Sequence, residues 1–247
     1  RGETVEDTVK VLQNFYDCIV LRTFAQSKIE EVAACADVPV INALTDAYHP
    51  CQILADFLTI VEHDKQLEGL KLTYVGDGNN MANTYLEGGA LCGMHVRIAS
   101  PEGYEVDPEV FAQCQAAADK YGTGATLELM RDPVAAVEGA DVVFTDTWTS
   151  MGDEAEHDMR VAAFQGYQVN AELMAHAAEG ALFMHCLPAH RGEEVTDEVM
   201  RAPYSVIYDE AGNRLHAQKA VMSLLMGVPA PAAALEAAEA VAGRWHA

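Results

Sequence analysis

The chain has 247 residues, half of them hydrophobic, and its 38 Asp and Glu against 15 Lys and Arg give a formal net charge of −23. A chain of this size and composition can bury a large core, either as one domain or as two smaller ones. Such an acidic surface repels phosphate groups, so neither nucleic acids nor anionic membranes are expected partners. Adaptation to high salt and an ordinary acidic cytosolic enzyme are both open explanations of the charge.

The chain opens on a helix signal. Thr4 and Asp7 have the spacing of a capping-box variant, which predicts a helix that starts right after Thr4. Because the first residues lead straight into this helix, we expect the interior of a longer protein. A β-branched run at Cys18–Leu21 then predicts a strand that ends at Arg22.

A second strand is expected at 38–41, and a long helix over Pro50–His63. Pro50 suits the first helical position, which places His49 and Gln52 where they can contact an anion or a carbonyl group together with the helix N-terminus. A lone His before a helix is more often a surface cap, and that alternative stays open. We place a domain boundary in the polar residues 64–69.

Further strands are expected at 71–75, 94–98, 125–129, 141–145, 182–185 and 205–208, most of them separated by helical spacing or capping signals. This alternation predicts an α/β fold of mostly parallel sheets flanked by helices on both faces. A turn at Val228–Pro231 predicts a last helix that returns to the first domain.

Two features of the whole chain bear on its compartment. No segment approaches the ~20 apolar residues of a membrane span. The six cysteines are dispersed, without a C-x-x-C pair, which indicates reduced thiols in a cytoplasm.

Distinctive side chains follow four of the expected strands directly. They are Arg22-Thr23-Phe24, Gly76-Asp77-Gly78-Asn79-Asn80, the segment from Asp146 to Gly152, and Cys186-Leu187-Pro188 with His190 and Arg191 beyond it. In open α/β sheets ligands bind outside the carboxyl ends of the strands, so we expect these groups to converge on one crevice. For the last of them, an ordinary strand-to-loop junction with a buried Cys is the alternative.

The turn after the strand at 71–75 resembles the start of a dinucleotide fingerprint, G-x-G, but Met81 stands where the third glycine belongs. A tight strand-to-helix turn explains Gly76 and Gly78 equally well. The amide row that begins with Asn79 and Asn80 suits a carboxylate-bearing or zwitterionic ligand instead.

Two groups of charged residues complement each other. Arg22, His49 and Arg214 form a candidate cationic set for a phosphate, although each arginine alone is more often a surface ion pair. Asp146, with the Ser150-Met151-Gly152 loop, is able to accept an ammonium group. A solvated acidic loop is the alternative for that segment.

Taken together, four motifs resemble those of the ornithine carbamoyltransferase family. They are His49-Pro50-Cys51-Gln52, Gly76-Asp77-Gly78-Asn79-Asn80, Asp146 with Ser150-Met151-Gly152, and His185-Cys186-Leu187-Pro188. The resemblance covers essentially the whole chain. The His-Pro-x-Gln element is shared by aspartate and ornithine carbamoyltransferases, whereas Ser-Met-Gly and His-Cys-Leu-Pro are characteristic of the ornithine branch.

The resemblance implies transfer of the carbamoyl group of carbamoyl phosphate to the side-chain amine of L-ornithine, giving L-citrulline and phosphate in arginine metabolism. It assigns carbamoyl phosphate to Arg22, His49, Pro50, Cys51, Gln52, Cys186, Leu187 and Arg214, of which Arg22, His49, Cys186 and Arg214 are the catalytic set. It assigns ornithine to Asn80, Asp146, Ser150 and Met151.

The resemblance also implies that the amine is the nucleophile, that Cys186 orients it without forming a covalent intermediate, and that neither a metal nor a redox cofactor takes part. It implies a homotrimer or a multiple of trimers. Residues 1–62 and 217–247 would bind carbamoyl phosphate, and residues 63–216 would bind ornithine.

One departure concerns the phosphate site. The family's Ser-Thr-Arg-Thr segment has no copy in this sequence and is expected upstream of its first residue, together with a glutamine partner. Each charge-assisted contact of such a segment is worth roughly 1.5 to 3 kcal/mol, so we expect a chain without it to lack full activity.

Three other functions remain open. One is carbamoyl transfer to another amine, such as aspartate or putrescine. Another is a dinucleotide-dependent oxidoreductase built on the Gly76 turn, and the third is a binding module without catalysis.

Overall fold

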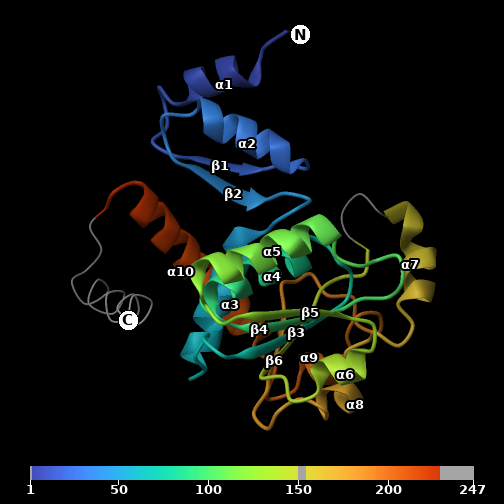
Figure 1. Ribbon diagram of the computed structural model, residues 1–247. Coiled ribbons are helices and arrows are strands. Elements are labelled where there is room, and N and C mark those ends of the chain that lie inside the picture. Colours follow the sequence, from blue (N-terminus) through green and yellow to red (C-terminus); the bar gives the residue numbers. More distant parts are fainter. Residues whose placement is uncertain (1, 150–153, 229–247) are drawn as a thin grey trace.

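The computed structural model describes residues 2–149 and 154–228. Its first part is a small layer of helices and strands at the N-terminal end of the molecule (Figure 1). The elements of this layer are α1 (Val5–Leu12), β1 (Ile19–Arg22), α2 (Gln26–Cys35) and β2 (Val40–Leu44), with β1 and β2 paired in parallel. The expected capping box starts α1, because the Thr4 side chain accepts from the Asp7 backbone while the Asp7 side chain accepts from the Thr4 backbone.

Helix α3 (Pro50–Glu62) leads from this layer into the rest of the molecule. Pro50 occupies its first turn, where the missing N–H costs nothing, and His49 is the N-cap residue. Most of the helix is buried, which its apolar sequence allows. The expected helix over Pro50–His63 is confirmed to within one residue.

The larger sheet has five parallel strands in the order β5-β4-β3-β6-β7. Their bounds are β3 (Lys71–Val75), β4 (His95–Ala99), β5 (Thr126–Met130), β6 (Val142–Thr145) and β7 (Leu182–His185). Apart from Lys71, the side chains of the central strands β3 and β6 and of the edge strand β7 are buried on both faces, as expected for a parallel sheet covered by helices. The predicted α/β class is therefore confirmed.

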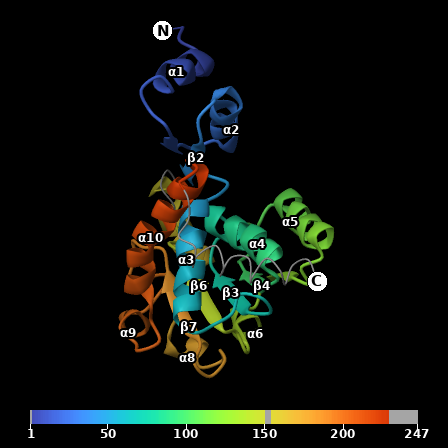
Figure 2. The same cartoon turned by 90° about the vertical axis from the view of Figure 1, so that its left-hand side faces the viewer.

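Helices cover both faces of this sheet (Figures 1 and 2). On one face lie α3, α4 (Asn80–Cys92) and α5 (Pro108–Tyr121), which enclose a core around Tyr74, Tyr85 and Phe144. On the other face lie α6 (Pro133–Val137), α8 (Ala171–Met174) and α9 (Asp197–Met200), around Val143 and Phe183. The 3-10 turn η1 (Glu154–Glu156) and α7 (His157–Ala163) lie at one end of the sheet.

The prediction of a strand at 205–208 was wrong. Ile207 begins α10 (Ile207–Leu225), and Ser205 contributes only an isolated bridge to Phe183 of β7. The short apolar run at 205–208 fits either a buried strand or a buried helix turn, and the acidic pair Asp209 and Glu210 behind it is a first-turn helix signal.

Helix α10 packs along α3, and the two run side by side in both views (Figures 1 and 2). This pairing brings the far end of the sequence next to the helix that joins the two layers. The last helix expected beyond the Val228–Pro231 turn lies outside the described residues. Among the residues that are described, no helix is both long and apolar enough to cross a membrane.

Candidate functional site

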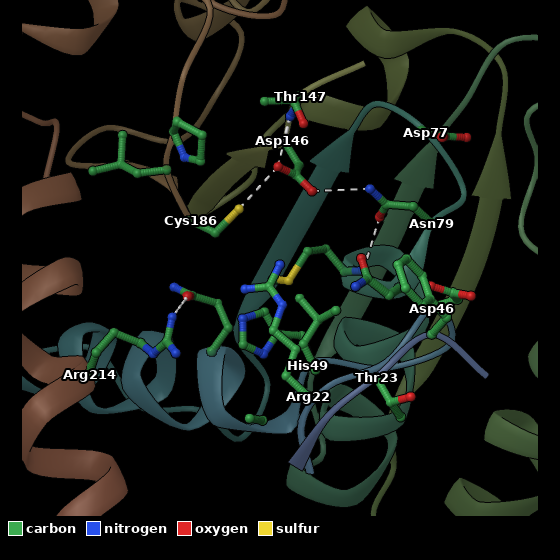
Figure 3. Close-up of a pocket in the computed structure, with 18 residues that line it drawn as sticks. Arg22, Thr23, Asp46, His49, Asp77, Asn79, Asp146, Thr147, Cys186 and Arg214 are labelled. Atoms are coloured by element: carbon green, nitrogen blue, oxygen red, sulfur yellow. Dashed lines mark hydrogen bonds between the residues drawn. The ribbon is translucent and has the colours of Figure 1, made fainter. Parts of the chain in front are cut away.

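A cavity of about 930 Å³ opens where the carboxyl ends of β1, β2, β3, β6 and β7 meet (Figure 3). Eight residues predicted for the site line it: Arg22, His49, Gln52, Asn80, Asp146, Cys186, Leu187 and Arg214. The expected convergence of strand ends is thus confirmed. It follows from parallel pairing, which places every carboxyl end of a sheet on one edge.

His49, Arg22 and Arg214 form the cationic wall of the cavity (Figure 3). The His49 backbone N–H donates to Thr84 Oγ1 at 2.9 Å, which fixes the residue at the start of α3. Its ring is largely buried, with Nδ1 left without a hydrogen-bond partner among the described residues. Burial, followed by the charges of Arg214 and Arg22, lowers the pKa of His49 to about 4. The imidazole is therefore neutral near pH 7.

Arg214 is held by two glutamines. Its Nη1 donates to Gln52 Oε1 at 2.5 Å. With the Gln218 amide oriented to accept, the Gln218 oxygen lies 2.7 Å from Nη2 and 2.8 Å from Nε of the same guanidinium. One N–H on each terminal nitrogen remains for a ligand, a pattern suited to an oxyanion.

Asp146 and Cys186 form the opposite wall, at the ends of β6 and β7. The Asp146 carboxylate accepts from Asn79 Nδ2 at 3.0 Å, from the Thr147 backbone at 2.7 Å and from Cys186 Sγ at 3.1 Å (Figure 3). These donors hold Asp146 in place without an arginine or lysine among them. A cationic group on a ligand would give this carboxylate the positively charged partner that its protein neighbours do not provide.

The Cys186 thiol stays protonated at neutral pH. Burial raises its pKa well above the usual range, and the adjacent Asp146 carboxylate raises it further. A protonated thiol is a weak nucleophile, which agrees with the expectation that Cys186 forms no covalent intermediate.

The Gly76–Asn80 turn has a structural explanation. A Cβ on Gly78 would lie 2.3 Å from the backbone of both Glu105 and Val106, so only glycine fits there. The Asn79 side chain caps α4 by accepting from the backbone of Met81 and Ala82. Because these N–H groups are already satisfied, the helix N-terminus is not open to a pyrophosphate, and the dinucleotide alternative loses its main support.

Other predicted residues take structural positions around the cavity. Asn80 faces it and donates from Nδ2 to the Thr45 carbonyl at 3.0 Å, which ties α4 to the segment after β2. Pro50 and Cys51 do not line the cavity, and the Cys51 thiol donates instead to the Asn42 carbonyl at 3.3 Å. Ser150 and Met151 lie outside the described residues.

The loop after β7 is held by its own hydrogen bonds and by one ion pair. His185 Nε2 lies 3.2 Å from Glu194 Oε1, with both side chains fully buried, while Nδ1 accepts from the Leu187 backbone at 2.9 Å. Arg191 Nε lies 2.9 Å from Asp197 Oδ1. These contacts place Cys186 and Leu187 at the cavity, and Arg191 supports the loop from outside it.

Two groups of described residues bring three potential metal-ligand atoms within 4.8 Å of one another. One consists of Asp146 and Cys186, which line the cavity, with the buried His185 behind them, and the other of His190, Glu193 and Glu194 in the loop after β7. In the first group, both nitrogens of His185 already have protein partners, so a metal there would have to displace one of them.

Several residues at this site were not predicted from the sequence. Ala43, Leu44 and Asp46 line the cavity from the end of β2, a strand that was expected to end at residue 41. Asp56, Glu210 and Gln218 lie behind the cationic wall. The i, i+4 spacing of Gln52 to Asp56 and of Arg214 to Gln218 is the only sequence signal for this arrangement.

The chain matches two family models. Residues 1–62 match the carbamoyl-P binding domain of aspartate/ornithine carbamoyltransferase, and residues 68–225 match the Asp/Orn binding domain of the same family.

Similar proteins carry one consistent description. An ornithine carbamoyltransferase of Symbiobacterium thermophilum is 56% identical over 226 residues, which are 92% of this chain and 72% of that protein. One from Carboxydothermus hydrogenoformans is 55% identical over 227 residues, with the same shares of each chain.

Solved structures agree in fold. The ornithine carbamoyltransferase of Gloeobacter violaceus superimposes with a TM-score of 0.84 at 52% identity, covering 91% of this chain and 75% of that one. The enzyme of Pyrococcus furiosus gives a TM-score of 0.87 at 50% identity, covering 93% and 73%.

Proposed function

The chain belongs to the aspartate/ornithine carbamoyltransferase family, and from this membership we propose that it works as an ornithine carbamoyltransferase. The reaction joins the side-chain nitrogen of L-ornithine to the carbonyl carbon of carbamoyl phosphate. The bond from that carbon to the phosphate oxygen breaks, the amine loses a proton, and L-citrulline and phosphate leave. The observation that carries this proposal is a single cavity with a cationic wall facing a carboxylate and thiol wall.

The cationic wall fits carbamoyl phosphate. Arg214 keeps one N–H on each terminal nitrogen for a phosphate oxygen, and Arg22 lies on the same wall. Neutral His49 polarises the carbonyl oxygen by donating a hydrogen bond, and needs no proton exchange to do so. Negative charge develops on the carbonyl oxygen and the leaving phosphate, which is where these donors act.

The opposite wall fits ornithine. Asp146 accepts a hydrogen bond from the α-ammonium group of ornithine. This group brings a positive charge, which the three protein donors to Asp146 do not carry. Asn80 contacts the same ligand from α4, and Ser150 and Met151 belong to the loop expected to close over it. The Cys186 thiol lies beside Asp146 on this wall and orients the side-chain amine, which must be neutral to attack.

The division of the chain is also a proposal. Residues 1–62 with 217–247 bind carbamoyl phosphate, and residues 63–216 bind ornithine. The ranges of the two family models support a boundary after residue 62, and the packing of α10 along α3 supports a return of the chain to its first part.

We assign the enzyme to arginine metabolism in the cytoplasm as a homotrimer or a multiple of trimers. Six free cysteines fit a reducing compartment. Exposed apolar side chains on the N-terminal layer, Val11, Phe15 and Tyr16 among them, fit an interface between subunits. Light scattering coupled to size-exclusion chromatography measures the oligomer directly.

The deciding experiment is a product assay. The protein is incubated with carbamoyl phosphate and equal concentrations of ornithine, aspartate or putrescine, and the carbamoylated products are quantified by mass spectrometry. We expect citrulline to dominate by at least about a hundredfold, since a site that pairs the ligand's charged groups rejects analogues that leave them unpaired. A dominant carbamoyl-aspartate or carbamoyl-putrescine product would overturn the assignment of ornithine.

A further inference from the structure

Two carboxyl groups are enclosed directly behind the cationic wall. Asp56 on α3 and Glu210 on α10 are both fully buried, and neither lines the cavity. Two enclosed carboxylates without a cation between them repel each other strongly, so such a pair retains one proton.

The contacts of the pair decide where that proton lies. Tyr85 Oη donates to Asp56 Oδ2 at 2.6 Å, which favours the ionised form of Asp56. Burial raises the pKa of Glu210 well above its usual range, and the neighbouring Asp56 charge raises it further. Burial raises the pKa of Asp56 as well, to about 7, so the pair holds one shared proton, and the Tyr85 hydrogen bond makes Glu210 the preferred site of that proton.

Gln52 contacts both carboxyl groups through its amide. Its Nε2 donates to Asp56 Oδ1 at 2.8 Å and to Glu210 Oε1 at 3.0 Å, while its Oε1 accepts from Arg214. A rotated amide would set Oε1 against the Asp56 carboxylate and Nε2 against the guanidinium, which would replace the hydrogen bonds to these two charged groups with repulsive contacts. Only one amide orientation is compatible with the buried pair.

The same pair reaches the opposite wall of the cavity. The His185 backbone N–H donates to Glu210 Oε2 at 2.9 Å, immediately before Cys186. Glu210 thus connects α10 both to α3, through Gln52, and to the end of β7.

We propose that Asp56 and Glu210 are positioning residues that share one proton, fix the Gln52 amide with its oxygen toward Arg214, and so hold the Arg214 guanidinium ready for the phosphate. The proposal rests on the proposed function for the identity of the ligand at Arg214. Neither carboxyl lines the cavity, and both act through Gln52.

The test variant is Glu210→Gln, which has the same shape and charge as protonated Glu210. The substituted side chain keeps an oxygen for the His185 N–H but places an NH₂ group where Gln52 needs an acceptor, and the Gln52 amide loses its fixed orientation. We expect KM for carbamoyl phosphate to rise roughly tenfold, the effect of one lost charge-assisted hydrogen bond, with less than a twofold change in KM for ornithine. Asp56→Asn should act in the same direction, and serves if Glu210→Gln fails to fold.

Asn213→Ala is the matched control. Asn213 is buried on α10 and donates to Thr59 Oγ1 at 2.9 Å and Glu62 Oε2 at 2.6 Å on α3, so it joins the same two helices without contacting Gln52. We expect it to lower Tm as much as Glu210→Gln does while leaving KM for carbamoyl phosphate unchanged. An equal KM rise in the control would mean that the pair merely holds the helices together, and would overturn the proposal.

A double-mutant cycle separates action through Gln52 from direct action. In a Gln52→Ala background, Glu210→Gln should change KM for carbamoyl phosphate by less than twofold, because the residue that transmits its effect is gone. Full additivity of the two substitutions would contradict the proposal.

The shared proton has a readout that needs no turnover. Infrared difference spectroscopy between H₂O and D₂O should give the C=O stretch of a protonated carboxylic acid at pH 7 in the unsubstituted protein, and Glu210→Gln should remove it. Absence of that band in the unsubstituted protein refutes the shared proton even if citrulline forms, whereas absence of citrulline with the band present refutes only the proposed function.

Discussion

Cys186 is the residue whose chemistry depends most on its surroundings. Its sequence context, with two histidines and an arginine close by, is also typical of an activated nucleophile or of a metal ligand. In the fold its partner is the Asp146 carboxylate, and both burial and that charge keep the thiol protonated by raising its pKa. The chemical role of this cysteine is thus set by the charge of its neighbours and not by its residue type alone.

At the residue scale, Asp146→Ala separates the two substrates. We expect KM for ornithine to rise roughly ten- to a hundredfold, the range of one lost hydrogen bond to a charged group, while KM for carbamoyl phosphate changes less than about threefold. Steady-state kinetics with each substrate varied in turn gives both values. Equal rises for both substrates would contradict the assignment of the two walls.

His49 links protonation to stability. Its pKa is about 4 in the folded chain and about 6.5 when unfolded, so the unfolded state binds more protons between these values. The free energy of unfolding is therefore unaffected by protonation of His49 above pH 6.5. It falls progressively as the pH drops from 6.5 to 4, by about 3 kcal/mol in all.

Two measurements check this prediction. The ¹H–¹⁵N NMR signals of the His49 ring should titrate near pH 4, and the free energy of unfolding should depend less on pH in His49→Gln than in the unsubstituted chain over this window. A ring that titrates near its ordinary value would show that the imidazole is charged during catalysis at about pH 6.

At the scale of elements, segments with clear flanking signals were predicted well, and the apolar run at 205–208 was not. Strands at 71–75 and 182–185 matched, since their apolar runs are flanked by clear turn and helix signals. The run at 205–208 was assigned to a strand, whereas packing against α3 makes it the first turn of α10. Local propensity does not decide a four-residue apolar segment that lacks such flanking signals, and its tertiary neighbours do.

The turn before α4 gives a prediction at this scale. In Gly78→Ala the new Cβ would meet backbone atoms of Glu105 and Val106 that cannot rotate away, so we expect a loss of about 2–4 kcal/mol in the free energy of unfolding and weaker ornithine binding. Chemical denaturation and ornithine titration measure the two effects.

Gly212→Ala is the control for that substitution. Gly212 lies in α10, where an added Cβ meets nothing within 4 Å, so alanine should stabilise the protein by about 0.5–1 kcal/mol. Similar effects of both substitutions would show that the close approach at Gly78 is not what requires glycine.

The net charge of −23 belongs to the whole molecule. Repulsion among exposed carboxylates is screened within ~3 Å at 1 M salt. If the charge is an adaptation to salt, Tm and activity should rise between low and molar potassium chloride, Tm by roughly 5 °C, or about 1–2 kcal/mol for a chain of this size. Scanning calorimetry and citrulline assays across the salt series measure both.

A variant with fewer charges is the control for the salt series. Glu68, Glu128 and Glu179 are exposed and make no ion pair within the described part of the chain. Replacing all three with Gln should reduce the salt dependence of Tm. A flat response in the unsubstituted protein would instead support an ordinary acidic enzyme.

By itself the sequence determined the α/β class, the convergence of strand ends and the family, because each depends on local periodicity or on short motifs that keep their residues adjacent. The roles assigned to the site residues, those of Asn80, Asp146, Ser150 and Met151 among them, remain predictions. Only the tertiary structure decided which way the Gln52 amide faces and what holds Arg214. Those contacts join Gln52 of α3 to Glu210 and Arg214 of α10, which lie 158 and 162 positions further along the chain. No local pattern encodes a hydrogen bond between two helices that meet only after the chain has folded.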